Sequence, residues 1–157
     1  MVDEKILAYL AGLIDGEGSI MIKKSTYRIR SPKYNDCVNP GYFIRVTMKN
    51  INKDVMELLK KTFGGSVWED RKVYTSKNGF QTRHRLWCFD IHDRQAENML
   101  RLLYPYLIIK KPQAEIALKL VEMKREARKA LVGNAYPPQF VQKFEELYHE
   151  IKRLNHK

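Results

Sequence analysis

LAGLIDGEGS, residues 10–19, joins the end of an apolar helix to a glycine-rich turn that carries two carboxylates. Apolar residues recur at helical spacing before and within this stretch, which predicts an amphipathic helix over Glu4–Asp15. Gly16 and Gly18 are expected to stop the helix, because glycine adopts backbone angles that other residues avoid. The pattern therefore holds Glu17 at a helix end, between two glycines.

The residue types of this stretch suit two chemical uses. Ala8, Ala11 and Gly12 form a stripe of small side chains, and such stripes let a second helix approach closely. The Glu17 carboxylate and the backbone carbonyl of Gly16 are hard oxygen ligands of the kind that Mg²⁺ prefers. If two copies of the helix pack side by side, two such sites meet, and paired metal ions are an arrangement that in-line phosphodiester hydrolysis can use. An ordinary core helix followed by a turn shows the same apolar pattern.

The composition indicates a nucleic-acid partner. The 157 residues include 29 Lys and Arg against 18 Asp and Glu, giving a net charge of +11. Such an excess favours a polyanion as partner. The length predicts a single domain over residues 1–157. A ribosomal-type protein, or a charge that serves only solubility, fits the same composition.

Cysteine and histidine patterns exclude other classes of site. Cys37 and Cys88 have neither the spacing of a metal site nor that of a disulfide framework, and the four histidines are scattered. The N-terminus shows no signal sequence, and no apolar stretch approaches the roughly 18 residues of a membrane span. We therefore expect a soluble, intracellular protein with no membrane partner and no small-molecule substrate.

The rest of the chain predicts an α+β fold in the order α-ββ-α-ββ-α-α-α. The expected strands, the last two joined through a turn at Ser76–Gly79, are Ser19–Arg30, Tyr42–Lys49, Ser66–Tyr74 and Gln81–Ile91. The expected helices after the first are 53–63, capped by Asn52, and Asp93–Tyr104, Lys111–Leu131 and Pro138–Leu154. Alternation along the strands predicts a curved, antiparallel four-stranded sheet backed by helices, with Trp87, Phe89 and Ile91 facing the core.

The polar face of this sheet carries the residue types that read DNA in the major groove. Alternate side chains would contact base edges while lysines and arginines hold phosphates. A solvated sheet face is the alternative, and a register shift of one residue exchanges contacting and buried positions. The candidates, of which Lys23, Ser25, Arg45 and Arg71 are the strongest, are Ser19, Met21, Lys23, Ser25, Tyr27, Arg28, Arg30, Arg45, Thr47, Lys49, Glu69, Arg71, Lys77, Arg83 and Arg85.

Residues 10–19 resemble the signature of the LAGLIDADG homing endonucleases, with Gly16-Glu17-Gly18-Ser19 at the position of the family's acidic end. The resemblance implies a homing endonuclease-like fold. It implies that Glu17 binds a catalytic Mg²⁺, for which Mn²⁺ can substitute, with help from the Gly16 carbonyl. Asp15 is similar to the family's structural acid, which steadies the turn.

Residues 103–114 resemble a second family signature, in which a lysine before a long helix approaches the scissile phosphate. Lys110 matches that position best, and the adjacent Lys111 is the alternative phosphate contact. A lysine there can stabilise developing negative charge or help to position or deprotonate the attacking water. Met48 stands where many relatives carry a glutamine that organises active-site water, so Lys49 and Asn50 are the candidates to replace it.

The chain contains one copy of the signature, and cutting both strands of a duplex needs two active sites, so we expect a symmetric homodimer. The resemblance implies an intron- or intein-associated, Mg²⁺-dependent endonuclease, encoded in an organelle or a microbe. Such enzymes cut long pseudo-palindromic DNA sites and leave short 3′ overhangs. The alternatives are an inactive binder of the same fold, either an RNA maturase or a transcription factor, and an unrelated metal nuclease built on Glu122-Met123-Lys124.

Overall fold

The protein is described by a computed structural model over residues 2–28, 38–70, 75–81, 85–131 and 135–156, without the side chains of 26–28, 38 and 39. The predicted α+β class and element order are confirmed. The elements are α1 (Glu4–Glu17), β1 (Gly18–Arg28), β2 (Val38–Asn50), α2 (Lys53–Phe63), β3 (Ser66–Asp70), β4 (Leu86–His92), α3 (Asp93–Leu103), α4 (Lys111–Lys129) and α5 (Pro138–Asn155).

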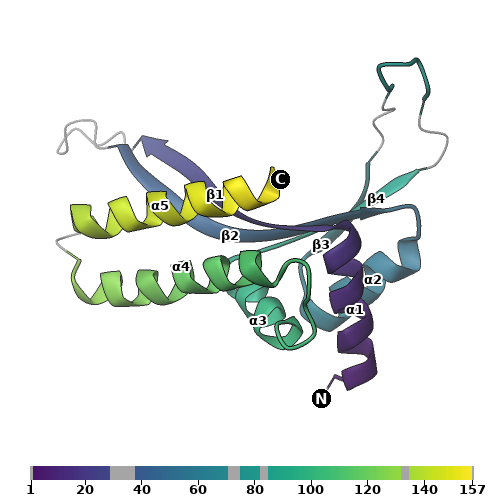
Figure 1. Ribbon diagram of the computed structural model, residues 1–157, viewed down its shortest axis with the longest axis horizontal. Coiled ribbons are helices and arrows are strands. Elements are labelled where there is room, and N and C mark those ends of the chain that lie inside the picture. Colours follow the sequence, from purple (N-terminus) through teal and green to yellow (C-terminus); the bar gives the residue numbers. More distant parts are fainter. Residues whose placement is uncertain (1, 29–37, 71–74, 82–84, 132–134, 157) are drawn as a thin grey trace.

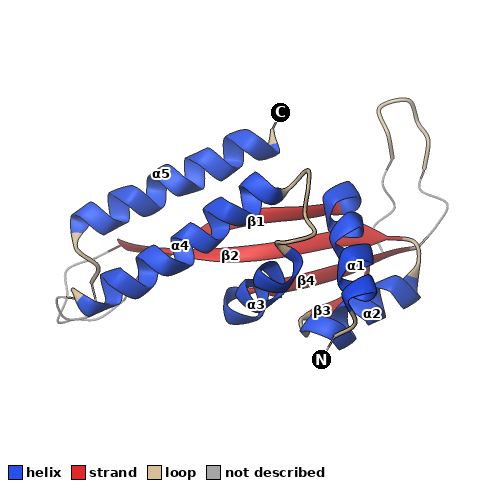
Figure 2. Cartoon of the chain, turned by 60° about the horizontal axis from the view of Figure 1, so that its bottom comes forward, coloured by secondary structure: helices blue, strands red, loops and turns tan. Residues whose placement is uncertain are grey.

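The four strands form one antiparallel sheet in the order β1-β2-β4-β3. Helices α1 to α4 lie over one face of the sheet, and α5 runs alongside the edge strand β1 (Figures 1 and 2). On the opposite face, called the open face below, no helix of the described residues covers the sheet. Among the described residues, no helix is long and apolar enough to cross a membrane.

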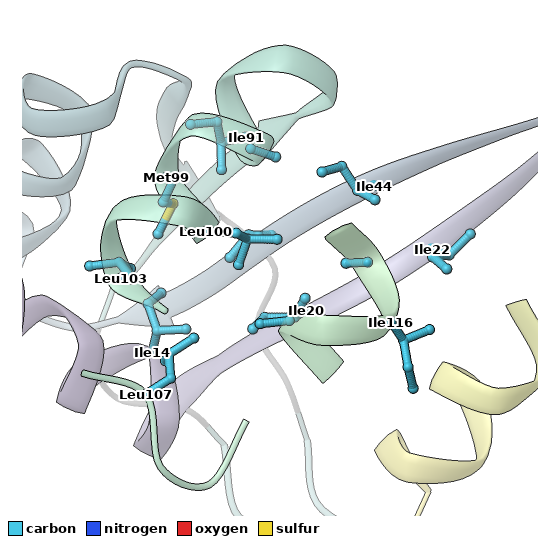
Figure 3. Close-up of a cluster of buried hydrophobic side chains, with 14 of the residues drawn as sticks. Ile14, Ile20, Ile22, Ile44, Ile91, Met99, Leu100, Leu103, Leu107 and Ile116 are labelled. Atoms are coloured by element: carbon cyan, nitrogen blue, oxygen red, sulfur yellow. The ribbon is translucent and has the colours of Figure 1, made fainter. Parts of the chain in front are cut away.

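The core lies between the sheet and the helices. Alternate strand residues, among them Ile20, Ile44 and Ile91, are buried and point toward side chains of α1, α3 and α4 such as Leu100 and Ile116 (Figure 3). Burial of apolar side chains is the dominant favourable contribution to folding. The residues between these buried positions consequently face the open side of the sheet.

Helix α1 is two residues longer than predicted, because it continues through Gly16 and ends at Glu17. The expectation that Gly16 and Gly18 adopt unusual backbone angles is wrong, since neither has a positive φ. Gly18 is needed for a different reason. A Cβ there would lie 2.8 Å from the carbonyl oxygen of Ile14, so the absence of a side chain lets β1 begin directly against the end of α1.

Several local signals act as predicted. Asn52 caps α2 by accepting hydrogen bonds from the backbone N–H groups of Asp54 (3.0 Å) and Val55 (3.3 Å), and Gly64 follows the helix with φ 87°. In the predicted turn, the Gly79 N–H donates to the Ser76 carbonyl at 2.9 Å. Strand β3 is described as far as Asp70 and β4 from Leu86, and the predicted continuations over residues 71–74 and 82–84 lie outside the described part of the chain.

Candidate active site and nucleic-acid interface

Glu17, the last residue of α1, is exposed and oriented by Asn50. The Asn50 Nδ2 group donates a hydrogen bond to Glu17 Oε2. Asn50 Oδ1 accepts one from the Asn52 N–H at 2.7 Å, which fixes the direction of the amide. Met48 is 2% exposed and packs in the core, so it takes no part in this arrangement. Of the two candidates to replace the expected glutamine, Asn50 is the one whose side chain contacts Glu17.

Asp15 joins the end of α1 to the start of α4. Its buried carboxylate accepts hydrogen bonds from the backbone N–H groups of Ile108 (2.7 Å), Ile109 (3.1 Å) and Lys110 (2.8 Å). Such charge-assisted bonds are stronger than those between neutral groups. The Lys110 Nζ group in turn donates to the Asp15 carbonyl oxygen. The Lys110 ammonium therefore lies against the last turn of α1, at the carbonyl of Asp15, which is two residues before Glu17.

Lys111 is directed elsewhere. Its ammonium lies over the ring of Tyr104, 4.7 Å from the ring centroid, which is a cation–π contact on the helical side of the molecule. The structure therefore separates two adjacent lysines that the sequence alone could not distinguish. Lys110 is the one that contacts the end of α1.

Glu122 and Lys124 of α4 have separate partners. Glu122 pairs with Arg101 and Arg125, while Lys124 Nζ donates to the Tyr42 carbonyl oxygen at 2.6 Å. Burial lowers the pKa of Lys124. The two side chains therefore do not converge on one site, and the alternative of a metal nuclease built on Glu122-Met123-Lys124 is not supported.

The open face of the sheet continues directly from Glu17. A depression of about 400 Å³ is lined by Glu17 and by side chains of β1, β2, β3 and β4. The predicted DNA-contacting residues that line it are Ser19, Met21, Lys23, Arg45, Thr47 and Lys49. Ser25 lies on the same face, with its Oγ 3.5 Å from the Gly41 carbonyl oxygen. A ligand lying along this face would therefore extend to the Glu17 carboxylate.

One predicted contact on β3, Glu69, has the wrong facing, and it pairs with Arg85, which lies just before β4. Alternation along β3 puts Trp68 on the open face and Glu69 on the helix-covered side, where Glu69 pairs with Arg85 at 3.2 Å. Lys77 is exposed in the turn after β3. The remaining predicted contacts, Arg30, Arg71 and Arg83 and the side chains of Tyr27 and Arg28, lie outside the described residues.

The open face also carries residues that the sequence analysis did not select. Asp90 pairs with Arg45, and Asp70 pairs with Lys49 at 2.9 Å. Cys88 lies in the same depression, where burial raises the pKa of its thiol. The predicted inward facing of Phe89 could have identified Cys88 and Asp90. Successive side chains on a strand point to opposite faces, so both neighbours of Phe89 face outward.

The outward side of α1 is apolar and closely approachable. Tyr9 and Ile6 are 51% and 36% exposed, and Ala8 is exposed beside them. Gly12 is open to solvent, since a Cβ added there meets nothing within 4 Å. Ala11, predicted on the same stripe, is fully buried within the chain and cannot contact a second copy. The small-residue stripe is therefore formed by Ala8 and Gly12 without Ala11.

The model of the LAGLIDADG endonuclease family matches residues 10–107, which include the motif, the sheet and the segment before Lys110. The chain belongs to the LAGLIDADG endonuclease family. No curated protein sequence matches it significantly. The family model thus confirms the resemblance predicted from residues 10–19, and it extends that resemblance across the four-stranded sheet.

Solved LAGLIDADG structures share the fold of this family member. The homing endonuclease I-CvuI, solved with its DNA target in the presence of Ca, is 19% identical with a TM-score of 0.67, covering 94% of this chain and 80% of its own. The archaeal intron-encoded I-Vdi141I with DNA is 16% identical (TM-score 0.68; 97% and 86% covered). The group I intron-encoded I-CeuI with DNA is 15% identical (TM-score 0.67; 96% and 68% covered).

Proposed function

We propose that this protein is a site-specific homing endonuclease that cuts both strands of duplex DNA as a homodimer. It uses Mg²⁺ and leaves short 3′ overhangs. The observation that carries the proposal is the position of Glu17, an exposed carboxylate at the end of the family motif, oriented by Asn50 and continuous with the open face of a basic sheet. Related endonucleases were solved on DNA, which supports the same kind of ligand here.

The donor groups around Glu17 fit a hard divalent cation. Glu17 Oε2 accepts from Asn50, and its other oxygen has no hydrogen bond among the described residues. The Gly16 carbonyl belongs to the last turn of α1, where helical carbonyls lack intrahelical partners. The described residues hold no group of three or more His, Cys, Asp or Glu side chains that could bind a metal. Mg²⁺ is commonly held by one or two carboxylates together with phosphates of the substrate.

The bound cation supplies charge stabilisation for phosphodiester hydrolysis. Asn50 holds the Glu17 carboxylate in place, and Asp15 fixes the backbone that carries Lys110. The Lys110 ammonium then lies beside the end of α1, where it stabilises the negative charge that develops on the phosphate or holds the attacking water. The open face binds the duplex, with the net charge of +11 attracting its phosphates.

A second copy of this chain completes the enzyme. The family motif occurs once, and the stripe of Ala8 and Gly12 lets two α1 helices pack closely, flanked by the exposed Tyr9. A two-fold axis between these helices brings the two Glu17 sites together. Each open face then contacts one half of a pseudo-palindromic target.

Changing Gly12 to Leu is expected to separate the dimer while leaving the single chain folded. The added side chain has free space in one copy but meets its partner in the dimer, and symmetry applies the overpacking cost of about 1–3 kcal/mol twice. We expect sedimentation equilibrium to show association weakened by roughly 30-fold or more, with double-strand cleavage lost in parallel. Ala130→Leu, which alters an exposed small residue at the end of α4, is the control. Unchanged association of the Gly12 variant would exclude this interface.

The proposed activity is tested by cleavage selection from plasmids with a long randomised insert. We expect linear product from a rare subset of plasmids with Mg²⁺ or Mn²⁺ and none with EDTA, and sequencing of the ends should show 3′ overhangs. Because many phosphate contacts are made, binding should weaken steeply as salt is raised. Tight binding of duplex sites without nicking in either metal would instead favour the inactive binder of the same fold.

A further inference from the structure

We infer that Arg45 and Asp90 together form a guanine-reading site on the open face of the sheet. The inference rests on the proposed function, since it names one base that the enzyme recognises. Arg45 pairs with His92 in the β2–β4 register and Asp90 pairs with Thr47, so the two side chains are diagonal neighbours on the same face. Arg45 also lines the depression that reaches Glu17.

The carboxylate of Asp90 occupies one edge of the Arg45 guanidinium. Arg45 Nε donates to both Asp90 oxygens at 2.9 Å, and Nη2 donates to Oδ2. Nη1 makes no hydrogen bond in the part of the chain that the structure describes. The free edge therefore keeps Nη1 and the second Nη2 proton as parallel donors. Guanine presents its N7 and O6 acceptors to such a fork in the major groove.

The pairing favours a base over a phosphate as the partner of Arg45. An adjacent carboxylate cancels much of the attraction that an arginine exerts on a phosphate, while it leaves the direction of the free donors intact. The Asp90 side chain is only 14% exposed, against 33% for Arg45, so the carboxylate is the more buried partner and restricts the orientation of the guanidinium. Because the Arg45 guanidinium is already held in one orientation before DNA binds, less conformational entropy is lost on binding. The pair with Asp90 thus fixes the orientation of the Arg45 donors, which a base contact requires, whereas a phosphate contact requires only positive charge.

The strand geometry predicts where this guanine lies in the target. Asn50, which contacts Glu17, and Arg45 are on the same strand, five residues apart. At about 3.4 Å per residue the separation is about 17 Å, and a duplex rises about 3.4 Å per base pair. For a strand that follows the groove, the guanine is expected about five base pairs from the cleaved phosphate, once in each half-site.

The first test uses base analogues in a duplex selected from a randomised library by the unaltered protein. At the expected guanine, 7-deazaguanine removes the N7 acceptor and 2-aminopurine removes O6, whereas inosine changes only the minor-groove edge. We expect about a 5- to 100-fold loss of affinity with each of the first two and a change within about twofold with inosine. Selected sites without a fixed guanine in this region, or equal effects of all three analogues, would overturn the inference.

The second test uses variants of the pair. Arg45→Lys and Asp90→Asn should relax base preference at this one position by about tenfold while preferences elsewhere in the site are kept. Arg125→Lys, which alters a comparable arginine–carboxylate pair with Glu97 on the helical side, should change no base preference. If Asp90→Asn keeps the guanine preference, Asp90 does not position Arg45. If the unaltered protein selects no DNA site at all, the proposed function itself fails.

Discussion

Replacing Glu17 by Gln is expected to preserve DNA binding and to lower the rate of cleavage about a thousandfold or more. The amide keeps the size of the side chain but removes the negative charge that a divalent cation requires, and the charge stabilisation from such an ion is worth several kcal/mol, at about 1.4 kcal/mol for each tenfold in rate. The exposed position of Glu17 means that the change costs little stability. Single-turnover cleavage and mobility-shift binding on one selected duplex measure the two effects separately.

The control for this variant is Glu57→Gln, which neutralises another exposed glutamate, on α2. It alters the net charge by the same amount and should change cleavage by less than about twofold, since surface charges away from the site act weakly. Undiminished cleavage by the Glu17→Gln protein would dismiss the metal-binding role of Glu17. A parallel loss of binding and cleavage would mean that Glu17 acts through the fold instead.

Replacing Asp15 by Ala is expected to lower the free energy of unfolding by about 3–5 kcal/mol. The change leaves three backbone N–H groups, those of Ile108, Ile109 and Lys110, without their acceptor at a buried position. Each such loss costs about 1–3 kcal/mol, reduced where water can enter. Denaturant unfolding monitored by circular dichroism gives the value. Activity should also fall, because the backbone of Lys110 is then released from the end of α1.

Asp3→Ala provides the comparison on the same helix. Asp3 caps the start of α1 with one hydrogen bond, to the Lys5 N–H at 2.8 Å, and its loss should cost about 1 kcal/mol. If Asp15→Ala costs no more than Asp3→Ala, the link between α1 and α4 does not carry the stability assigned to it.

Local sequence patterns were sufficient for most of the fold. The helix before Glu17, the Asn52 cap and the alternation along β1 each depend on neighbours a few residues away, and all three were predicted correctly. The prediction of which face of the sheet a side chain lies on was less accurate for short strands. On β3, of five residues, a single step exchanges Trp68 and Glu69 between the two faces, and nothing in the local pattern opposes that step. Ala11 was misplaced for a similar reason, since α1 is apolar on more than one side.

The candidate site was only partly accessible from the sequence. The motif and the segment before Lys110 were identified separately, but the bonds that join them span 93 to 95 residues and depend on the folded backbone. The contact between Asn50 and Glu17 likewise requires the β1–β2 register, with Gly18 opposite Met48. Distances of this kind are set by tertiary packing, which no short pattern records.

The bonds that Asp15 makes have a consequence for how relatives of this protein can diverge. Its partners are main-chain N–H groups, which every amino acid except proline provides. The side chains of Ile108 and Ile109 are 82% and 69% exposed, so packing within the chain places little restriction on them. Packing within the chain thus allows other side chains at positions 108 and 109 as long as proline is excluded, whereas Asp15 must keep its carboxylate to accept the three hydrogen bonds.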